Sequence, residues 1–187
     1  MSTRVVLIRG VNVGGKNKVP MADLRECLAG LGASDVTTYI ASGNAIVDTD
    51  VPGAEFAARI EQELPRRFHL HDELVKVLVL GAEQLRAIVD ERPKGFGEQP
   101  TVYHSDAIFL MGGFDVAEAM AAFQPREGVD VVWPGDGVIY SQRLSAERTR
   151  SRLNKIMSSP AYKSMTIRSW QTTLKLVELT DSRTGGA

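Results

Sequence analysis

The sequence predicts an α+β protein built from duplicated ferredoxin-like β-α-β-β-α-β units with mainly antiparallel sheets. Short β-branched, apolar runs alternate with stretches in which apolar residues recur at helical spacing, and in the first 80 residues they follow the ferredoxin-like order. After a segment rich in proline and glycine, the same order begins again. The halves share no convincing residue identity, so the predicted repeat is one of structure.

The first unit is predicted from apolar faces and turn residues. Met21, Leu24, Leu28 and Leu31 lie on one helical face, and Pro20 before them suits the first position of a helix. The expected order is strand Val5–Ile8, a helix from Pro20 to Leu31, strands Val36–Ile40 and Ala45–Asp48 joined at Ser42-Gly43-Asn44, a helix carrying Phe56, Ile60 and Leu64, and strand Leu74–Leu80.

The second unit repeats this pattern less regularly. We divide the chain into a first unit over residues 1–81, a short helix and Pro/Gly loop over 82–104, and a second unit over 105–187 that ends in a helix. The expected elements are helix Ala82–Glu91, loop Arg92–His104, strand Ile108–Met111, helix Val116–Phe123, strands Val129–Trp133 and Val138–Ser141, a basic helix Arg148–Met157, strand Met165–Arg168 and helix Trp170–Leu179.

Composition favours a cytoplasmic globular protein. Hydrophobic residues make up 43% and charged residues 24% of the chain, and no stretch reaches the ~18 apolar residues of a membrane span. Cys27 is the only cysteine, which fits a reducing compartment. The 22 basic residues nearly balance the 23 acidic ones, which argues against a high-capacity nucleic-acid binder. Eight of the basic residues nevertheless lie between Arg143 and Lys175, where Glu147 is the only acidic residue.

The loop after the first strand is the most informative segment. Gly10, four residues later Gly15, and then Lys16 come within one residue of a phosphate-binding P-loop, but Asn17 stands where that motif needs Ser or Thr. Lys18, Val19 and Pro20 also separate the lysine from the helix, so we reject a true P-loop. The glycines could still expose backbone N–H groups to an anion, although a solvated turn is the simpler interpretation.

Topology strengthens the anion hypothesis. In a ferredoxin-like sheet the first strand lies antiparallel to the third, so Ser42-Gly43-Asn44 is expected beside the glycine loop. The start of the helix at Pro20 should lie at the same edge, where its dipole favours negative charge. We therefore predict that polar donors converge at this edge of the sheet.

These residues resemble a known family. The runs Leu7–Lys18, Met21–Arg25 and Thr38–Asn44 are similar to a bacterial family of proteins of unknown function, domain-of-unknown-function family 1697. Thr166–Leu176 resembles that family's closing Arg-Asn-Trp-Asn-Thr signature, with Ser169 and Gln171 in place of two asparagines. The resemblance implies a duplicated ferredoxin-like fold and transfers no activity.

The two most recognisable segments of this resemblance, the glycine loop and the stretch Arg168–Lys175, are both rich in anion donors. Trp170 adds a face on which a base could stack, but we favour core packing on the last helix for that residue. The predicted ligand-binding residues are Arg9, Asn12, Gly14, Gly15, Lys16, Asn17, Lys18, Ser42, Asn44, Arg168, Trp170 and Lys175.

Other chemical groups do not form a recognisable site in the sequence. His69 and His71, with Asp72, could offer metal ligands, but an exposed turn explains them better, and we predict no metal and no cofactor. His104 lies in the Pro/Gly loop without an assignable partner. Cys27 is expected to be a small buried side chain rather than a nucleophile.

Three functions stay open at this stage. The first is binding of a phosphate-containing ligand, either a nucleotide or nucleic acid. The second is an enzyme acting on a phosphorylated or acidic metabolite, for which the sequence shows no general base. The third is a protein–protein interaction module whose sheet edges pair. The sequence leaves the ligand, the oligomeric state and the roles of the two halves undefined.

Overall fold

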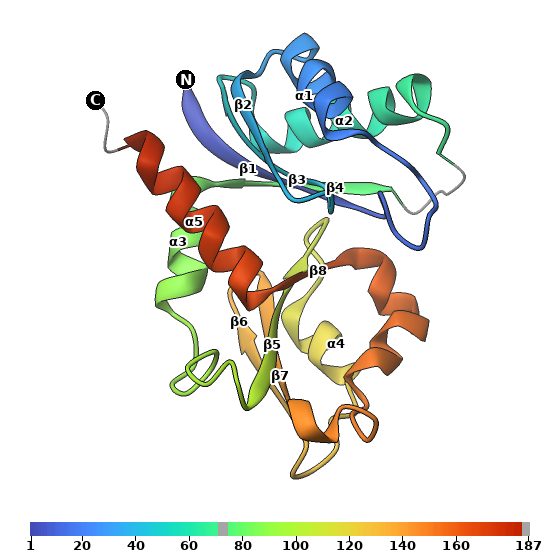
Figure 1. The fold of residues 1–187 in the computed structure, drawn as a ribbon, viewed down its shortest axis with the longest axis vertical. Helices are drawn as coiled ribbons and strands as arrows, with labels where there is room; N and C mark the ends of the chain where they lie inside the picture. Colours follow the sequence, from blue (N-terminus) through green and yellow to red (C-terminus); the bar gives the residue numbers. More distant parts are fainter. Residues whose placement is uncertain (71–74, 185–187) are drawn as a thin grey trace. The chain divides into compact units, whose positions relative to one another are not determined.

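The computed structural model describes residues 1–70 and 75–184, and the chain forms two compact units (Figure 1). The first unit comprises Met1–Arg86 together with the chain from Leu176 onward, and the second comprises Ala87–Lys175. Each unit holds one four-stranded antiparallel sheet. The prediction of a mixed α and β protein with antiparallel sheets is therefore confirmed.

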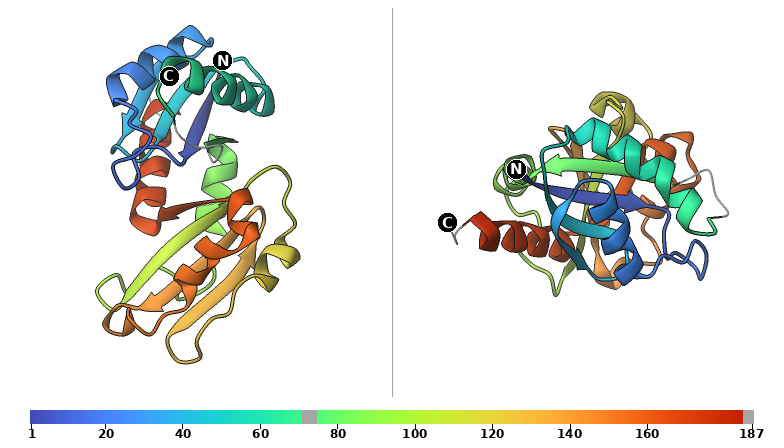
Figure 2. Two further views of the ribbon diagram at one scale, coloured as in Figure 1. Left: turned by 90° about the vertical axis from the view of Figure 1, so that its right-hand side faces the viewer. Right: turned by 90° about the horizontal axis from the view of Figure 1, so that it is seen from above.

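The sheet of the first unit has the strand order β2-β3-β1-β4. Val5 of β1 pairs with Ile46 of β3 and with Leu80 of β4. Figures 1 and 2 show α1 and α2 on the same face of this sheet. Leu74, where we expected the fourth strand to begin, lies outside the described residues. The elements are β1 (Ser2–Arg9), α1 (Met21–Gly30), β2 (Ser34–Tyr39), β3 (Asn44–Thr49), α2 (Gly53–Arg67) and β4 (Lys76–Gly81).

The core of the first unit lies between its sheet and its two helices. Side chains alternate in direction along a strand, so Val6 and Ile8 of β1 face the helices. There they join Leu24 of α1 and Phe56 and Ile60 of α2 in one buried cluster. Complete burial of each such side chain contributes roughly 1.5–3 kcal/mol to the free energy of folding. The buried cluster therefore holds β1 in place, and with it the point at which β1 ends and its loop begins.

The last helix, α5 (Trp170–Thr184), begins in the second unit and ends in the first. Its Arg183 side chain donates to Thr37 Oγ1 of β2 at 2.8 Å and to the carbonyl oxygen of Ile46 at 3.2 Å. The same guanidinium lies 3.6 Å from Asp48 Oδ1 and is only 12% exposed. The C-terminal turns of α5 are therefore attached to β2 and β3.

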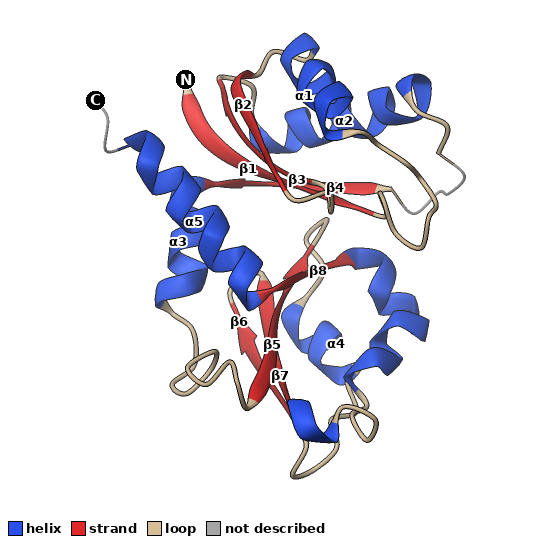
Figure 3. Ribbon diagram, viewed as in Figure 1, coloured by secondary structure: helices blue, strands red, loops and turns tan. Residues whose placement is uncertain are grey.

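The second unit has the strand order β6-β7-β5-β8. Its buried cluster takes Ala119 from α4, Ile156 from a 3₁₀ helix and Ile108, Ile139 and Met165 from the sheet. Figure 3 distinguishes these helical segments from the strands. The elements are α3 (Ala82–Asp90), shared with the first unit, then β5 (Tyr103–Leu110), α4 (Val116–Ala121), β6 (Asp130–Gly135), β7 (Val138–Leu144), the 3₁₀ helices η1 (Ser145–Glu147), η2 (Leu153–Ser158) and η3 (Pro160–Ser164), and β8 (Met165–Ser169).

The basic helix expected over Arg148–Met157 is wrong. That region holds only the 3₁₀ segment η2, and Pro160, which has no N–H and disfavours the α conformation of the residue before it, prevents a longer helix. Asp130 accepts hydrogen bonds from the backbone N–H groups of Arg126 and Arg152, at 3.0 and 2.8 Å, and fixes the preceding turn. The loop expected over residues 92–104 also ends earlier, because β5 starts at Tyr103.

Candidate functional site

Two polar loops of the first unit lie side by side where β1 ends. We call residues 9–19 and 40–44 together the loop edge. The N–H of Ile8 donates to the carbonyl oxygen of Gly43 at 2.7 Å, and the side chain of Asn12 donates to the carbonyl oxygen of Ala41 at 2.8 Å. The glycine loop and the β2–β3 turn therefore adjoin each other, as the antiparallel pairing of β1 with β3 requires.

The glycine loop is a small hairpin rather than a P-loop. Asn12 N–H donates to the carbonyl oxygen of Asn17 at 2.9 Å, and Lys16 N–H donates to that of Val13 at 3.0 Å. Gly14 and Gly15, at the tip, have φ angles of +58° and +77°, which with the Lys16–Val13 bond is the pattern of a type I′ turn. A phosphate cradle that leads directly into a helix is therefore not formed here.

Two asparagines hold this hairpin in place. Asn12 Nδ2 also donates to the carbonyl oxygen of Val19 at 2.9 Å, and Asn12 Oδ1 accepts from Val19 N–H at 2.8 Å. Asn17 Nδ2 donates to the carbonyl oxygen of Gly10 at 2.9 Å. Both asparagines have positive φ angles, +55° and +48°, a conformation that asparagine tolerates better than most residues. Their side chains therefore serve first to shape the loop.

The β2–β3 turn is equally constrained. A Cβ on Gly43 would lie 2.6 Å from the carbonyl oxygen of Ile8, and its φ angle is +76°. The completely buried Asn44 donates to Ser42 Oγ at 2.9 Å and to the carbonyl oxygen of Tyr39 at 3.2 Å. Ile40 has a φ angle of +48°, an unfavourable conformation for a β-branched residue, and its side chain is 51% exposed.

Charge at the loop edge comes from three basic residues. Lys16 and Lys18 are exposed, whereas Arg9, the last residue of β1, is 6% exposed. Helix α1 begins just beyond, and its N-cap, Pro20, provides no side-chain cap for the first N–H groups. Asp23 is the acidic residue of that first turn. The loop edge thus combines two exposed cations with an uncapped helix N-terminus.

The other predicted ligand-binding residues belong to the second unit. Arg168 is buried on β8 and donates to Thr166 Oγ1 at 2.9 Å and to the carbonyl oxygen of Ile167 at 2.8 Å. Burial lowers the pKa of its guanidinium to about 10. Trp170 is only 3% exposed and packs against Phe96, with the ring centroids 4.9 Å apart. Most of its ring is therefore occupied by packing, and Lys175 lies at the boundary of the unit.

A histidine–aspartate pair was missed by the sequence prediction. His104 Nε2 lies 3.1 Å from Asp106 Oδ1 on β5, and their side chains are 46% and 16% exposed. Burial raises the pKa of the Asp106 carboxyl, and nearby His104 and Arg143 partly offset this rise. The i, i+2 spacing would have indicated one face of a strand, but we had placed His104 in a loop.

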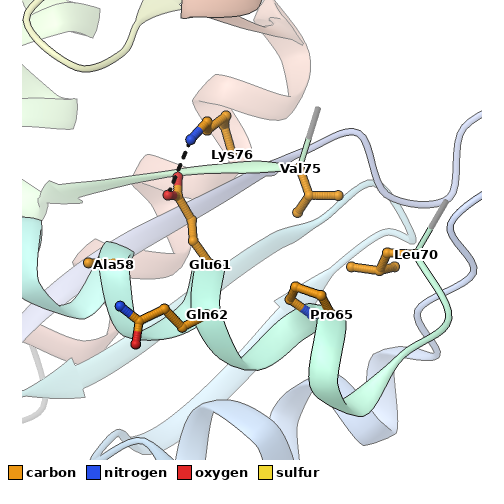
Figure 4. A pocket seen from close by; sticks show the side chains of 7 residues that line it. All are labelled: Ala58, Glu61, Gln62, Pro65, Leu70, Val75 and Lys76. Atoms are coloured by element: carbon orange, nitrogen blue, oxygen red, sulfur yellow. Dashed lines mark ion pairs between the residues drawn. The ribbon is translucent and has the colours of Figure 1, made fainter. Parts of the chain in front are cut away.

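A pocket of about 380 Å³ lies between α2 and β4 of the first unit (Figure 4). Pro65, Leu70 and Val75 form its apolar side. Its carboxylate, Glu61, already accepts from Val77 N–H at 2.8 Å and lies 3.6 Å from Lys76 Nζ. The charged groups of this pocket therefore neutralise each other, and we assign it no function.

Residues 1–70 and 75–184 contain no group of three metal-binding side chains close enough to hold an ion. Of the proposed metal ligands only His69 is described, because His71 and Asp72 lie outside the described residues. Cys27 is buried, and burial raises the pKa of its thiol, so the reactive thiolate is disfavoured. Within the same described ranges, no helix has the length and apolar character needed to cross a membrane.

The fold and the loop edge define a mixed α and β protein with two four-stranded antiparallel sheets and one tightly built polar hairpin. The chain belongs to the family of proteins of unknown function DUF1697, whose model matches residues 1–140. The family named from the sequence is thus confirmed. The matched range includes the loop edge and excludes the segment around Trp170.

The chain is also similar to a solved structure, that of a conserved bacterial protein from Streptococcus pneumoniae. The two are 26% identical, the TM-score is 0.79, and the similarity covers 96% of this chain and 98% of the other. No curated protein matches this chain significantly.

Proposed function

We propose that this protein binds a phosphate-containing ligand, a nucleotide or a short nucleic-acid segment, at the loop edge of the first unit. The observation that carries the proposal is the construction of the hairpin. Asn12 fixes it to Val19 and to Ala41, so Lys16 and Lys18 project from a support that is already ordered. A preordered loop loses less conformational entropy on binding than a flexible one.

The start of α1 supports the choice of an anion. The first N–H groups of a helix lack intrahelical partners, and the helix dipole places partial positive charge there. Pro20 provides no side-chain cap, and Lys18 comes two residues earlier in the chain. Asp23 in the first turn opposes this charge, so the two lysines would supply the net attraction.

The ligand is expected to be small. The chain has a formal net charge of −1, and two exposed lysines can neutralise only a few phosphates. A polymer that contacts many phosphates would lose affinity by roughly 0.7–0.9 log units per log unit of salt for each phosphate neutralised. A single nucleotide would show a much smaller dependence, which makes the salt slope the measurement that distinguishes the two.

The test is a titration with ATP, inorganic phosphate and a short oligonucleotide of wild type, Lys16→Ala and Lys18→Ala. Lys94→Ala, which removes an exposed lysine of the second unit, is the matched control. Loss of one charge-assisted hydrogen bond, worth about 1.5–3 kcal/mol, should weaken binding by about tenfold or more. Wild-type binding that neither loop-edge variant changes, or the absence of binding to all three probes, would refute the proposal.

We further propose that the two units are a duplicated ferredoxin-like motif and that the protein acts in the cytoplasm. The matching strand orders, β2-β3-β1-β4 and β6-β7-β5-β8, support the duplication. In the second unit η2 and η3 stand where the motif has its second helix. A reducing compartment is supported by the single, buried cysteine.

A further inference from the structure

A smaller pocket lies in the second unit, between the chain that follows α4 and the 3₁₀ helix η2. Its volume is about 220 Å³, below the ~300–1,000 Å³ usual for drug-sized ligands, so it suits only a small molecule. Phe123 and Ile156 belong to its apolar lining, and both are buried. Of the described residues that line the pocket, none is acidic. Its polar lining consists of Gln124, Arg152, Lys155, Ser158 and Ser159.

The 3₁₀ conformation of η2 aligns three of these polar residues. Lys155 N–H donates to the carbonyl oxygen of Arg152 at 3.0 Å, a bond between residues three apart. Side chains three apart eclipse one another in a 3₁₀ helix, because each turn contains three residues. Arg152, Lys155 and Ser158 therefore lie along one side of η2, and all three line the pocket. An α-helix, with about 3.6 residues per turn, would rotate Ser158 out of this line.

Asp130 holds the two walls of the pocket together. Its Oδ2 accepts from the N–H of Arg126, two residues after Gln124, at 3.0 Å, and from the N–H of Arg152 at 2.8 Å. Asp130 itself does not line the pocket, and its Oδ2 is engaged by these two N–H groups. Walls that are ordered in advance lose less conformational entropy when a ligand binds.

The cations of this pocket have no protein partner. In the part of the chain that the structure describes, the side chains of Arg152 and Lys155 form no hydrogen bond and no ion pair, and both are exposed. Ser159 Oγ is buried and likewise lacks a hydrogen-bond partner among the described residues. Buried polar groups almost always have a partner, so a ligand or a water is expected beside this hydroxyl. The donors of the pocket are therefore available to an acceptor from outside the protein.

We propose that this pocket binds a small phosphate monoester, with its phosphate group between Arg152 and Lys155 and its organic group against Phe123. A phosphate monoester carries a charge of about −1.5 to −2 at pH 7 and has three acceptor oxygens. This charge matches two cations, whereas a phosphate diester or a single carboxylate would neutralise only one. The serine hydroxyls supply further donors for the remaining oxygens. The site shares no residue with the loop edge.

The experiment compares butyl phosphate with its isomer diethyl phosphate at about pH 7.5. The two contain the same atoms, but the monoester is mainly a dianion at this pH, since its second pKa is about 6, and the diester is a monoanion. Both are titrated into wild-type protein by two-dimensional NMR, and the amide signals of residues 122–124 and 152–159 report on the pocket. We expect the monoester to bind about tenfold more tightly, the effect of one additional charge-assisted hydrogen bond.

Lys155→Ala and Arg152→Ala should each weaken butyl phosphate binding by about tenfold and reduce its preference over diethyl phosphate. Both side chains are exposed, so neither change should unfold the protein. Lys163→Ala is the matched control, because it removes an exposed lysine of η3 that does not line the pocket, and it should leave both affinities unchanged.

Three results would overturn the proposal. Butyl phosphate would cause no saturable shift of the pocket signals, would bind no more tightly than diethyl phosphate, or would bind wild type and Lys155→Ala equally. The amide signals of residues 12–18 report separately on the loop edge. A failure at this pocket is therefore distinguishable from a failure of ligand binding at the loop edge.

Discussion

The side chain of Asn12 reaches across 29 residues of sequence and donates a 2.8 Å hydrogen bond to the carbonyl oxygen of Ala41. The same amide group also donates to the carbonyl oxygen of Val19, and its oxygen accepts the Val19 N–H. One side chain thus joins the glycine loop to the β2–β3 turn and to the segment that leads into α1. Together with the Asn17 side chain, which donates to the carbonyl oxygen of Gly10, it holds the hairpin that carries Lys16 and Lys18.

Asn12→Asp should therefore destabilise the protein more than the loss of ordinary surface contacts would. The acceptor for Val19 N–H remains, but an anionic oxygen now faces the two carbonyl oxygens that the amide bonded. Leaving such groups unsatisfied costs about 1–3 kcal/mol, and the repulsion adds to it. Urea denaturation of wild type, Asn12→Asp and Asn12→Ala measures the effect, and equal stability of all three would contradict it.

Gly43→Ala should be strongly destabilising, whereas Gly14→Ala should be mild. Both glycines have positive φ angles, which costs an L-residue roughly 1–2 kcal/mol. At Gly43 the new Cβ would also lie 2.6 Å from the backbone oxygen of Ile8, while at Gly14 nothing lies within 4 Å. The difference between the unfolding free energies of the two variants measures the cost of the clash between the new Cβ at position 43 and the Ile8 carbonyl oxygen. Similar values would show that the turn can open at little cost.

Asp130 should make stability depend on pH in the acid range. Burial alone would raise the pKa of its carboxyl. Hydrogen bonds from the backbone of Arg152, the side chain of Ser151 and the backbone of Arg126, together with the charge of Arg143, outweigh burial and lower this pKa. A lowered folded-state pKa gives stability that is present above the unfolded value, about 3.9, and is lost as pH falls through the folded value. Asp130→Asn should remove this component.

Urea midpoints measured between neutral pH and pH 2 for wild type and Asp130→Asn check this expectation. The difference between the two proteins should be greatest near neutral pH and should shrink as the wild-type carboxyl is protonated. Asp136→Asn, at the exposed β6–β7 turn, controls for the removal of one surface charge. A difference that stays constant with pH would show that Asp130 acts only through its shape.

The sequence allowed the sheet of the first unit to be predicted because its cues are local. Turn residues Ser42-Gly43-Asn44 mark the hairpin, and the apolar run of β1 identifies its central strand. Placement of the glycine loop beside that turn then follows from antiparallel pairing. The hairpin inside the loop was not foreseen, although Gly14-Gly15 is a local turn signal. Its attachment to the β2–β3 turn could not be predicted, because it depends on the contact of Asn12 with Ala41, 29 residues along the chain.

The second unit was less predictable for the same reason. Prolines and glycines before Tyr103 suggested a loop that continued through His104, and the pairing of β5 with β7 overrode that local signal. The partnership of His104 with Asp106 was hidden by the same error. The segment after Glu147 has a composition typical of a helix. Asp130, the first residue of β6, nevertheless accepts a hydrogen bond from the backbone of Arg152, and Pro160 prevents a longer helix.

Arg183→Ala should lower the free energy of unfolding by about 2–4 kcal/mol, because it detaches the end of α5 from β2 and β3. Arg183 is 12% exposed, and removing it takes one donor from Thr37 Oγ1 and one from the Ile46 carbonyl oxygen and removes the positive charge beside Asp48. Arg66→Ala is the matched control, since Arg66 is 72% exposed and lies 3.8 Å from Glu63, a geometry worth less than about 1 kcal/mol. Hydrogen exchange should show faster exchange at the C-terminal turns of α5 in Arg183→Ala alone. Unchanged protection there would mean that Arg183 does not hold the end of this helix in place.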